Sequence, residues 1–286
     1  MVGVENMWEK IRMDEKGFTG LEAAIVLIAF VVVAAVFSYV MLGAGFFTTQ
    51  KSQEVVHTGV QQASSSIELA GDVVVKGDDT IANAVDTITF YVTVTAGSTP
   101  VDLDKTIISY KDDDEFFSKI PWAYASIVRE PNEFPADNLV EKNELYKITV
   151  YLDKKVTAVT GESVTITTGS GSLTNFPVIP GTLSLKDASN NYYMDDGNGN
   201  IVQSDGTDVG DIDYSTGAIT TTLADGTYTA NYRYTEPGTA GTDYPSSLPQ
   251  TNEKIQLELK PPTGATLVIV RTLPAELSTN DYYVVY

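Results

Sequence analysis

The apolar and polar positions divide the chain into a long apolar run, an amphipathic continuation and a region of short alternating runs. From 18 to 47 the only polar side chains are those of Thr19, Glu22 and Ser38. A bilayer is crossed by roughly 20 apolar residues in a helix, about 30 Å long. The run therefore predicts a helix that can span a membrane.

Beyond residue 47 the apolar positions recur at alternating spacings of four and three, which is the stripe of a packed helix. Such a helix, taken as one element over 19–70, would be roughly 78 Å long. We expect residues 18–71 to form the core helix of an assembly, because a rod of this length needs neighbours to bury its stripe. The stripe consists of Val56, Val60, Ala63, Ile67 and Ala70.

From residue 72 onward the chain carries the two-residue alternation of half-buried strands. Alternating runs occupy 87–95, 145–152, 163–167 and 255–259. Short strands broken by Gly, Pro and Asp clusters are typical of an antiparallel sandwich or barrel. The predicted fold class is therefore α+β, with a long N-terminal helix followed by an all-β outer domain in two parts, 72–177 and 237–286.

The segment between these two parts has the features of an insertion. Residues 178–236 are flanked by prolines and have a middle rich in Gly, Asp and Asn. Insertions are tolerated best in surface loops. We expect a small β module that leans on the main β-domain or on adjacent subunits, since about 60 residues alone are marginally stable.

Charge and cysteine content exclude several classes of function. The formal net charge is −20 at pH 7, which disfavours binding to nucleic acid phosphates or anionic lipid surfaces. Cysteine is absent, so disulfides, thiolate nucleophiles and zinc–thiolate sites are excluded. The fold must be stabilised by packing.

The flanks of the apolar run distinguish three interpretations. A secretory signal would begin with net positive charge and end at small residues such as 43–45, but residues 1–17 carry three positive and four negative side chains. A plain membrane anchor explains the length of the run but not Glu22, because a charge within hydrocarbon is costly. An interfacial carboxylate at the helix end would explain Glu22. A processed precursor is the third interpretation.

The junction of leader and helix favours that third interpretation. Lys16-Gly17 followed by Phe18-Thr19-Gly20-Leu21-Glu22 and the apolar helix resembles the class III signal and N-terminal domain of archaeal flagellins, the archaellins, within the type IV pilin-like superfamily. The similarity extends over about 16–75 and returns in 260–265 and 271–274. It implies that a prepilin-type peptidase removes residues 1–17 by cutting between Gly17 and Phe18.

The resemblance also implies a function and a set of partners. The mature chain would polymerise, with itself or with sibling archaellins, into an extracellular archaellum filament for swimming, from a precursor held in the cytoplasmic membrane. A membrane platform, an assembly ATPase and a motor are the implied partners. Besides the stripe, Phe18, Gly20 and Glu22 are the expected assembly residues. The Phe18 ammonium created by cleavage and Glu22 lie four residues apart, within reach along a helix or between neighbours.

Two other classes of function remain open. An adhesive pilin-like subunit could bind surfaces or glycans through its inserted module. An enzymatic ectodomain on a membrane tether has no positive support, because the chain has one histidine, His57, and no G-x-S-x-G motif. We expect no catalytic residues.

Metal and sugar attachment sites are weakly indicated. Oxygen ligands for calcium or another cation could come from the outer β-domain, but Ile201 and Thr207 break the EF-hand pattern, and hairpin turns are the favoured interpretation. No Asn-x-Ser/Thr tripeptide occurs, so N-glycosylation of the usual kind is not expected. The candidate ligands are Asp195, Asp196, Asn198 and Asn200.

Overall fold

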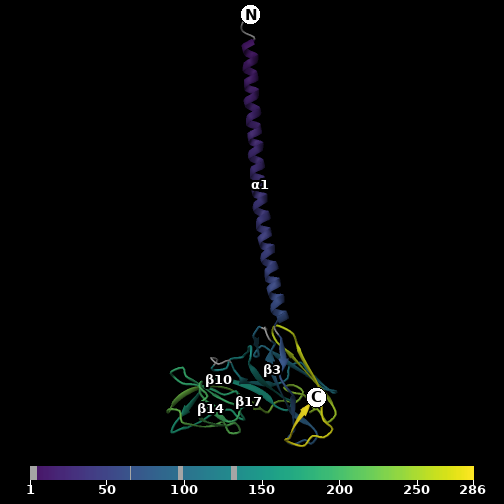
Figure 1. The fold of residues 1–286 in the computed structure, drawn as a ribbon, viewed down its shortest axis with the longest axis vertical. Coiled ribbons are helices and arrows are strands. Elements are labelled where there is room, and N and C mark those ends of the chain that lie inside the picture. The colour runs from purple at the N-terminus through teal and green to yellow at the C-terminus, as the bar shows by residue number, and fades with distance from the viewer. Residues whose placement is uncertain (1–4, 65, 96–98, 130–133) are drawn as a thin grey trace. The chain divides into compact units, whose positions relative to one another are not determined.

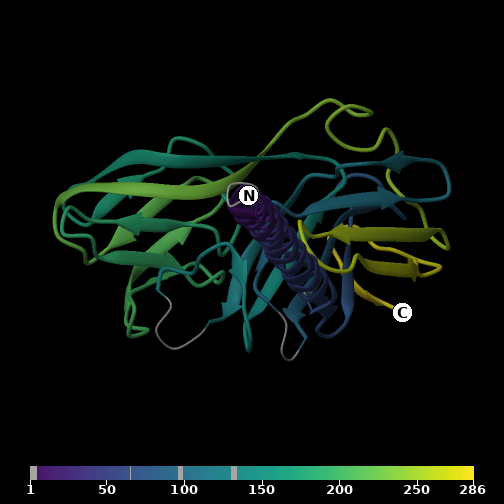
Figure 2. The ribbon, with the colours of Figure 1, turned by 90° about the horizontal axis from the view of Figure 1, so that it is seen from above.

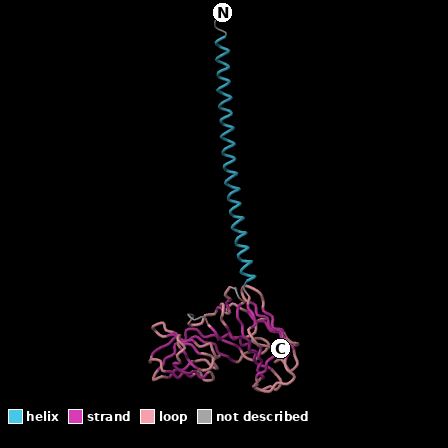
Figure 3. Tube along the Cα trace, viewed as in Figure 1, coloured by secondary structure: helices cyan, strands magenta, loops and turns pink. Residues whose placement is uncertain are grey.

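The computed structural model describes residues 5–64, 66–95, 99–129 and 134–286, with the backbone alone for 5–19 and 61–64. The chain divides into two compact units, residues 1–60 and 61–286. One helix, α1 (Glu5–Ser64), accounts for the first unit, and the second consists of strands and loops (Figures 1 and 3). The predicted α+β class, a long N-terminal helix followed by an all-β region, is confirmed.

Both ends of the predicted helix need correction. Helix α1 contains 60 residues and begins inside the polar leader at Glu5, since the leader consists mainly of residues compatible with a helix. It ends at Ser64 rather than at residue 70. A run of serines follows Ala63, and serine hydroxyls compete for backbone hydrogen bonds, which favours helix ends.

Ile67 and Ala70 therefore do not belong to the helical stripe. Ile67 lies in strand β1 (Ile67–Leu69), is 4% exposed, and pairs with Val94 of β3. Ala70 donates its N–H to the carbonyl of Tyr91 over 2.8 Å. The four-and-three spacing continues past Ser64, but sheet pairing and burial of Ile67 in the β core override it.

The β unit is built from antiparallel sheets of six, eight, four and two strands. The six-stranded sheet contains β1 (Ile67–Leu69), β2 (Val73–Gly77), β3 (Val85–Val94), β7 (Trp122–Val128), β9 (Leu145–Tyr151) and β20 (Tyr282–Val285). The four-stranded sheet contains β5 (Ile107–Lys111), β6 (Phe116–Phe117), β18 (Lys254–Lys260) and β19 (Leu267–Thr272), and the two-stranded sheet pairs β4 (Val101–Asp102) with β8 (Leu139–Val140).

The six-stranded and four-stranded sheets share one hydrophobic core. Strand β3 alternates buried and half-buried positions along its length, and β18 shows the same alternation. Phe90 of β3, Ile148 of β9 and Leu257 of β18 belong to the same buried cluster. Two sheets that bury their inner faces against each other form a sandwich, as the strand pattern predicts.

The eight-stranded sheet forms a second module with its own core. Its strands are β10 (Lys155–Ile166), β11 (Ser170–Ser172), β12 (Ser184–Lys186), β13 (Tyr192–Asp195), β14 (Asn200–Val202), β15 (Asp208–Asp213), β16 (Ala218–Thr221) and β17 (Gly226–Glu236). The first and last strands in spatial order are β10 and β11, which the turn 167–170 joins directly. The sheet therefore nearly closes into a barrel.

This second module is larger than the predicted insertion, which was placed at 178–236. Strand β10 pairs with β17 along almost its whole length, from Lys155 opposite Glu236 to Ile166 opposite Gly226. Val164 and Ile166 are buried in the second core. The module therefore begins at Lys155. In Figure 2 its green strands lie beside the blue and yellow strands of the sandwich.

Candidate assembly site

Helix α1 presents an apolar surface whose described side chains are exposed. By length and composition the segment Gly20–Val60 can cross a membrane, and its most apolar window has no buried residue. Each large apolar side chain contributes roughly 1.5–3 kcal/mol when it is fully buried. This surface therefore needs a bilayer or neighbouring helices. Its large exposed side chains up to residue 47 include Leu21, Ile25, Leu27, Ile28, Phe30, Val33, Phe37, Tyr39, Met41, Leu42, Phe46 and Phe47.

The expected assembly residues Gly20, Glu22, Val56 and Val60 all lie on this exposed helix. Val56 is 62% exposed and Val60 is 60% exposed, so both are available to a neighbour. Ala63 lies in the helical backbone, but its side chain is outside the described part. The stripe thus loses Ile67 and Ala70, and Val56 and Val60 are its exposed helical members.

The polar end of the helix begins at Thr48. The hydroxyls of Thr48 and Thr49 donate to the carbonyls of Ala44 and Gly45, four residues earlier, over 2.8 and 2.9 Å. Such bonds satisfy hydroxyls without water, which suits a position at the edge of an apolar environment. His57 is exposed on the same polar part of the helix.

Apart from Gly20, the sequence prediction did not name the glycines of the helix as assembly residues. A Cβ at Gly43, Gly45 or Gly59 would meet no atom within 4 Å beyond the helix's own nearby backbone, so no such contact with the described residues explains them. Glycine costs a helix about 1 kcal/mol relative to alanine. Small residues allow helix backbones to approach closely in an apolar medium. The sequence shows that these positions are glycines, but only the structure shows that the helix surface around them is open.

The predicted cleavage residues Lys16, Gly17 and Phe18 lie within the helical backbone, and their side chains are outside the described part. Helix α1 passes through Gly17 without a break. It also passes through residues 43–45, the small residues that a secretory signal would use. Glu22 therefore lies well inside the helix of the uncleaved chain rather than at its end.

The four candidate cation ligands of the second module form turns. Asp195 is 4% exposed and accepts hydrogen bonds from the N–H groups of Gly181, Leu183 and Gly197 and from the Tyr214 hydroxyl. Burial raises the pKa of Asp195, although these four donors act to lower it. The donors occupy the carboxylate oxygens that a cation would need.

The turn between β13 and β14 is organised by the next carboxylate. Asp196 accepts from the backbone N–H groups and the side-chain amides of Asn198 and Asn200, at distances from 2.8 to 3.4 Å. Burial acts against its charged form, but these hydrogen bonds outweigh it and lower the pKa of Asp196. This arrangement matches the hairpin turn that the sequence favours.

A different acidic cluster lies in the main sandwich. Asp78, Asp86 and Asp153 each place a carboxylate oxygen within 4.8 Å of the others. Asp86 is fully buried, and one oxygen of Asp86 and one of Asp153 have no hydrogen-bond partner among the described residues. Oxygen ligands of this kind suit Ca²⁺ or Mg²⁺.

Two lysines already supply part of the counter-charge to this cluster. Lys76 Nζ lies 3.2 Å from Asp86, and Lys154 Nζ lies 3.1 Å from Asp153. The three carboxylates come from the end of β2, from β3 and from the turn after β9, so only the tertiary fold assembles them. Nothing in their sequence spacing indicates the cluster.

A long uncovered apolar helix joined to a β-domain defines a subunit that buries its helix in a membrane or in a polymer. The sequence profile of the archaeal-type flagellin family matches residues 17–178, more than half of the chain. The chain therefore belongs to the archaeal-type flagellin family.

Individual relatives agree with this assignment. Probable flagellin 2 of Archaeoglobus fulgidus is 53% identical over 159 residues, which cover 49% of this chain and 74% of that sequence. The 24 kDa flagellin of Methanospirillum hungatei is 94% identical over 32 residues, 11% of this chain and all of that sequence. The structure of the archaeal flagellum of Methanospirillum hungatei strain JF1 superimposes with a TM-score of 0.51 at 25% identity, covering 93% of this chain and 99% of that one.

The family profile ends inside the second module. Its match stops at residue 178, within the chain segment that connects β11 to β12. Strands β12 to β17 thus lie beyond the matched region. The helix and most of the sandwich carry the family likeness, and most of the second module lies outside it.

Proposed function

We propose that the mature chain is a structural subunit of an archaellum filament, in which the α1 helices of many copies pack into the filament core and the β units form the outer wall. The observation that carries this proposal is the uncovered apolar surface of α1 in a member of the archaeal flagellin family. The polymer is a homopolymer or includes sibling subunits. The role is structural rather than enzymatic.

Before assembly, the same helix holds the precursor in the cytoplasmic membrane. A prepilin-type peptidase cuts between Gly17 and Phe18 and leaves an ammonium at Phe18. A carboxylate inside an apolar helix needs a partner. Glu22 provides one for this ammonium, either in the same chain or in a neighbour. A membrane platform, an assembly ATPase and a rotary motor complete the machinery that adds subunits and turns the filament.

N-terminal sequencing of filaments sheared from cells tests processing and assembly together. The expected subunit begins at Phe18 and retains the apolar helix. A subunit that begins after residue 45 would establish the secretory-signal interpretation and remove the helix from the filament. Electron microscopy of the same preparation shows whether the sequenced subunit is the one that forms the filaments.

A further inference from the structure

A cleft of about 520 Å³ separates the sandwich from the second module. One wall is strand β7 of the sandwich, and the other walls come from β10, β12 and β17 of the second module. Binding sites for small molecules commonly enclose about 300–1,000 Å³ and lie between domains. Most of the module that builds these other walls lies beyond the region that matches the flagellin family.

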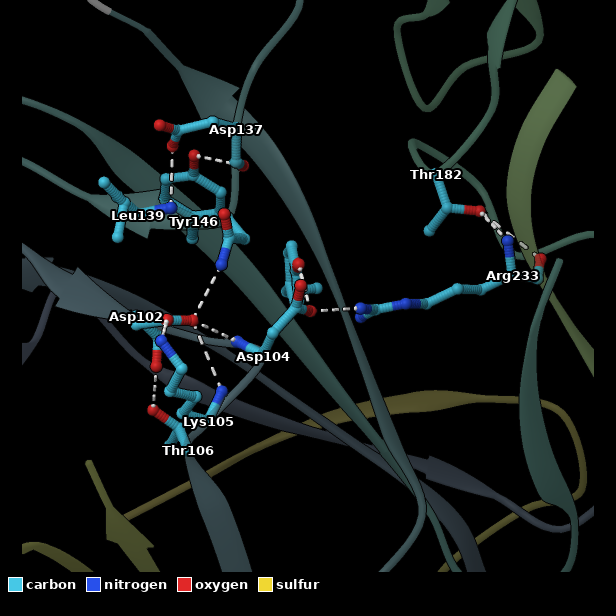
Figure 4. A network of polar contacts seen from close by, with 11 residues as sticks. Asp102, Asp104, Lys105, Thr106, Asp137, Leu139, Tyr146, Thr182 and Arg233 are labelled. Atoms are coloured by element: carbon cyan, nitrogen blue, oxygen red, sulfur yellow. Dashed lines mark hydrogen bonds and ion pairs between the residues drawn. The ribbon is translucent and has the colours of Figure 1, made fainter. Parts of the chain in front are cut away.

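Fixed contacts hold the two walls together. Arg233 of β17 reaches across to Asp104, 2.8 Å away (Figure 4). Its guanidinium lies 4.0 Å from the centre of the Tyr124 ring. The Tyr124 hydroxyl donates to the same Asp104 over 2.6 Å. Gly181 has φ +82°, and a Cβ there would lie 2.5 Å from the Cβ of Ala125. The cleft is therefore a defined space with a preformed shape.

Both facing strands carry a β-bulge where they line the cleft. The pairing of β7 with β9 shifts between Ser126 and Val128. The pairing of β10 with β17 shifts between Val159 and Glu162, so that Thr160 lies in the irregular stretch. Bulges redirect side chains and are over-represented next to binding and active sites. In this protein they occur where Ser126 and Thr160 line the cleft.

Several polar groups of the cleft have unused hydrogen-bonding capacity. Ser126 Oγ is buried and has no partner among the described residues. Asn231 accepts the N–H of Gly161 over 2.8 Å through Oδ1, which leaves its Nδ2 amide group available. Leaving a buried polar atom unpaired is costly, so a ligand or water that supplies the missing bond is favoured. Thr160, exposed to the cleft, adds a hydroxyl.

The charge of the walls indicates a neutral ligand. Arg233 is already paired with Asp104, and the chain as a whole carries −20, which repels anions. Asp137 also lines the cleft, and its carboxylate accepts the N–H of Leu139 over 2.7 Å. The other polar side chains are mainly hydroxyls and amides, interspersed with apolar surface from Val159 and Met194. Hydroxyls both donate and accept hydrogen bonds. A polyhydroxylated ring with an apolar face fits this combination.

We propose that this cleft binds a neutral saccharide, contacted by Ser126 Oγ, Thr160 Oγ1 and Asn231 Nδ2. The second module then adds surface recognition to a subunit whose helix does the polymerising. This inference does not depend on how the helix assembles. Binding and assembly are accordingly measured as separate properties.

Three conservative variants of the full chain test the proposal. Ser126→Ala and Thr160→Val each remove one hydroxyl, and Asn231→Asp keeps Oδ1 as the acceptor while it removes the donor. Purified filaments and detergent-solubilised subunits are applied to a printed panel of neutral oligosaccharides built from glucose, mannose, galactose and N-acetylglucosamine. We expect saturable binding by the wild type and a roughly tenfold higher Kd for each variant, the size of one lost hydrogen bond.

Matched controls lie on the exposed face of the same strand β10. Ser163→Ala and Thr165→Val make the same chemical changes outside the cleft and should leave the Kd unchanged. Ser126→Ala should not lower the melting temperature, because it removes a buried hydroxyl that lacks a partner. If a variant binds sugar more weakly while its melting temperature is unchanged, the mutation has removed a contact with the ligand rather than destabilised the fold.

Two results would overturn the proposal. The first is that no sugar of the panel binds the wild type, or that binding is equal in the cleft variants and the controls. The second is that the cleft variants abolish filament formation with no sugar bound. The cleft would then be a contact site for a segment of the neighbouring subunit. If no sugar binds, or if binding is equal in variants and controls, normal filaments would still support the proposed structural role of the chain.

Discussion

At the scale of single residues, Glu22 is the exception in an otherwise apolar surface. A helix inserts into a bilayer more readily without a charge, on the order of 2.5–3.5 kcal/mol for a central position. The retention of this carboxylate therefore requires a benefit after insertion. The proposed benefit is a charge pair with the ammonium at Phe18.

Glu22→Ala should leave membrane insertion intact and strongly reduce the number and length of filaments. Glu54→Ala is the matched control on the same helix, because Glu54 forms an exposed pair with Lys51 over 2.6 Å that is worth little. Membrane fractionation measures insertion, and electron microscopy measures assembly. Filaments of normal number and length in the Glu22 variant would rule out the pairing.

Glu162 provides a pH-dependent contact at the residue scale. It accepts hydrogen bonds from the Tyr232 hydroxyl and from the hydroxyl and N–H of Thr174. Burial acts to raise the pKa of Glu162, but these three hydrogen bonds outweigh it and hold the pKa below its usual value of 4.5. Because the folded pKa is depressed, the stabilisation is complete above 4.5 and is lost as the pH falls through the folded pKa.

Glu162→Gln should lower the free energy of unfolding by about 1 kcal/mol at pH 7, a modest value because the group is partly solvated. The difference from the wild type should shrink as the pH falls below 4.5 and through the folded pKa, because the wild-type carboxylate then becomes protonated. Thermal unfolding of the solubilised full chain across this range measures the difference. A gap that is constant with pH would show that the charge of Glu162 does not stabilise the fold.

At the scale of elements, strand pairing decides which polar residues meet. Strands β2 and β3 are antiparallel neighbours, and β9 pairs with the other side of β3. This arrangement brings Asp153 to Asp78 and Asp86, although Asp153 is distant from both in sequence. Three carboxylates share two lysine partners, so the cluster retains a deficit of positive charge.

A divalent cation should relieve this repulsion. We expect millimolar Ca²⁺ or Mg²⁺ to raise the melting temperature of the solubilised wild type by several degrees and to have little effect on Asp153→Asn. Asp211→Asn is the control, since Asp211 is exposed on β15 and lies outside the cluster. Equal cation responses in all three proteins would mean that the ions act elsewhere, and the cluster would then be an ion-pair network alone.

At the scale of the whole molecule, the second module is separable from the filament core. Its sheet is held by the long pairing of β10 with β17, and its buried side chains form a cluster of their own. Lys155 and Glu236, the two ends of the module, face each other across neighbouring strands. A short link can therefore join the chain on either side of it.

Deletion of residues 155–236 with a short Gly/Ser link should give filaments that assemble and are thinner or smoother. Deletion of 178–236 should instead leave β10 without β17, exposing Val164 and Ile166, and should produce aggregated or degraded subunit. Electron microscopy and the level of processed subunit distinguish the outcomes. Loss of filaments despite normal levels of folded subunit after the larger deletion would show that outer contacts hold the polymer together.

Local patterns in the sequence are enough to predict the helix, the main strands and the family likeness. The apolar run from 18 to 47 has few alternatives to a helix in a membrane or a bundle, because its backbone must satisfy its own hydrogen bonds. The alternation in 87–95, 145–152 and 255–259 likewise predicts β3, β9 and β18, since one face of each strand is buried. These features are local in the chain.

The features that depend on pairing between distant segments emerge from the fold alone. Ile67 continues the helical spacing, yet it is buried in β1 because Val94 pairs with it across the sheet. Lys155 begins the second module because β17 returns to pair with β10, which no local pattern indicates. The acidic cluster and the saccharide cleft have the same origin. Pairing between distant strands fixes which side chains meet. The spacing of apolar residues along the chain does not indicate which strands pair.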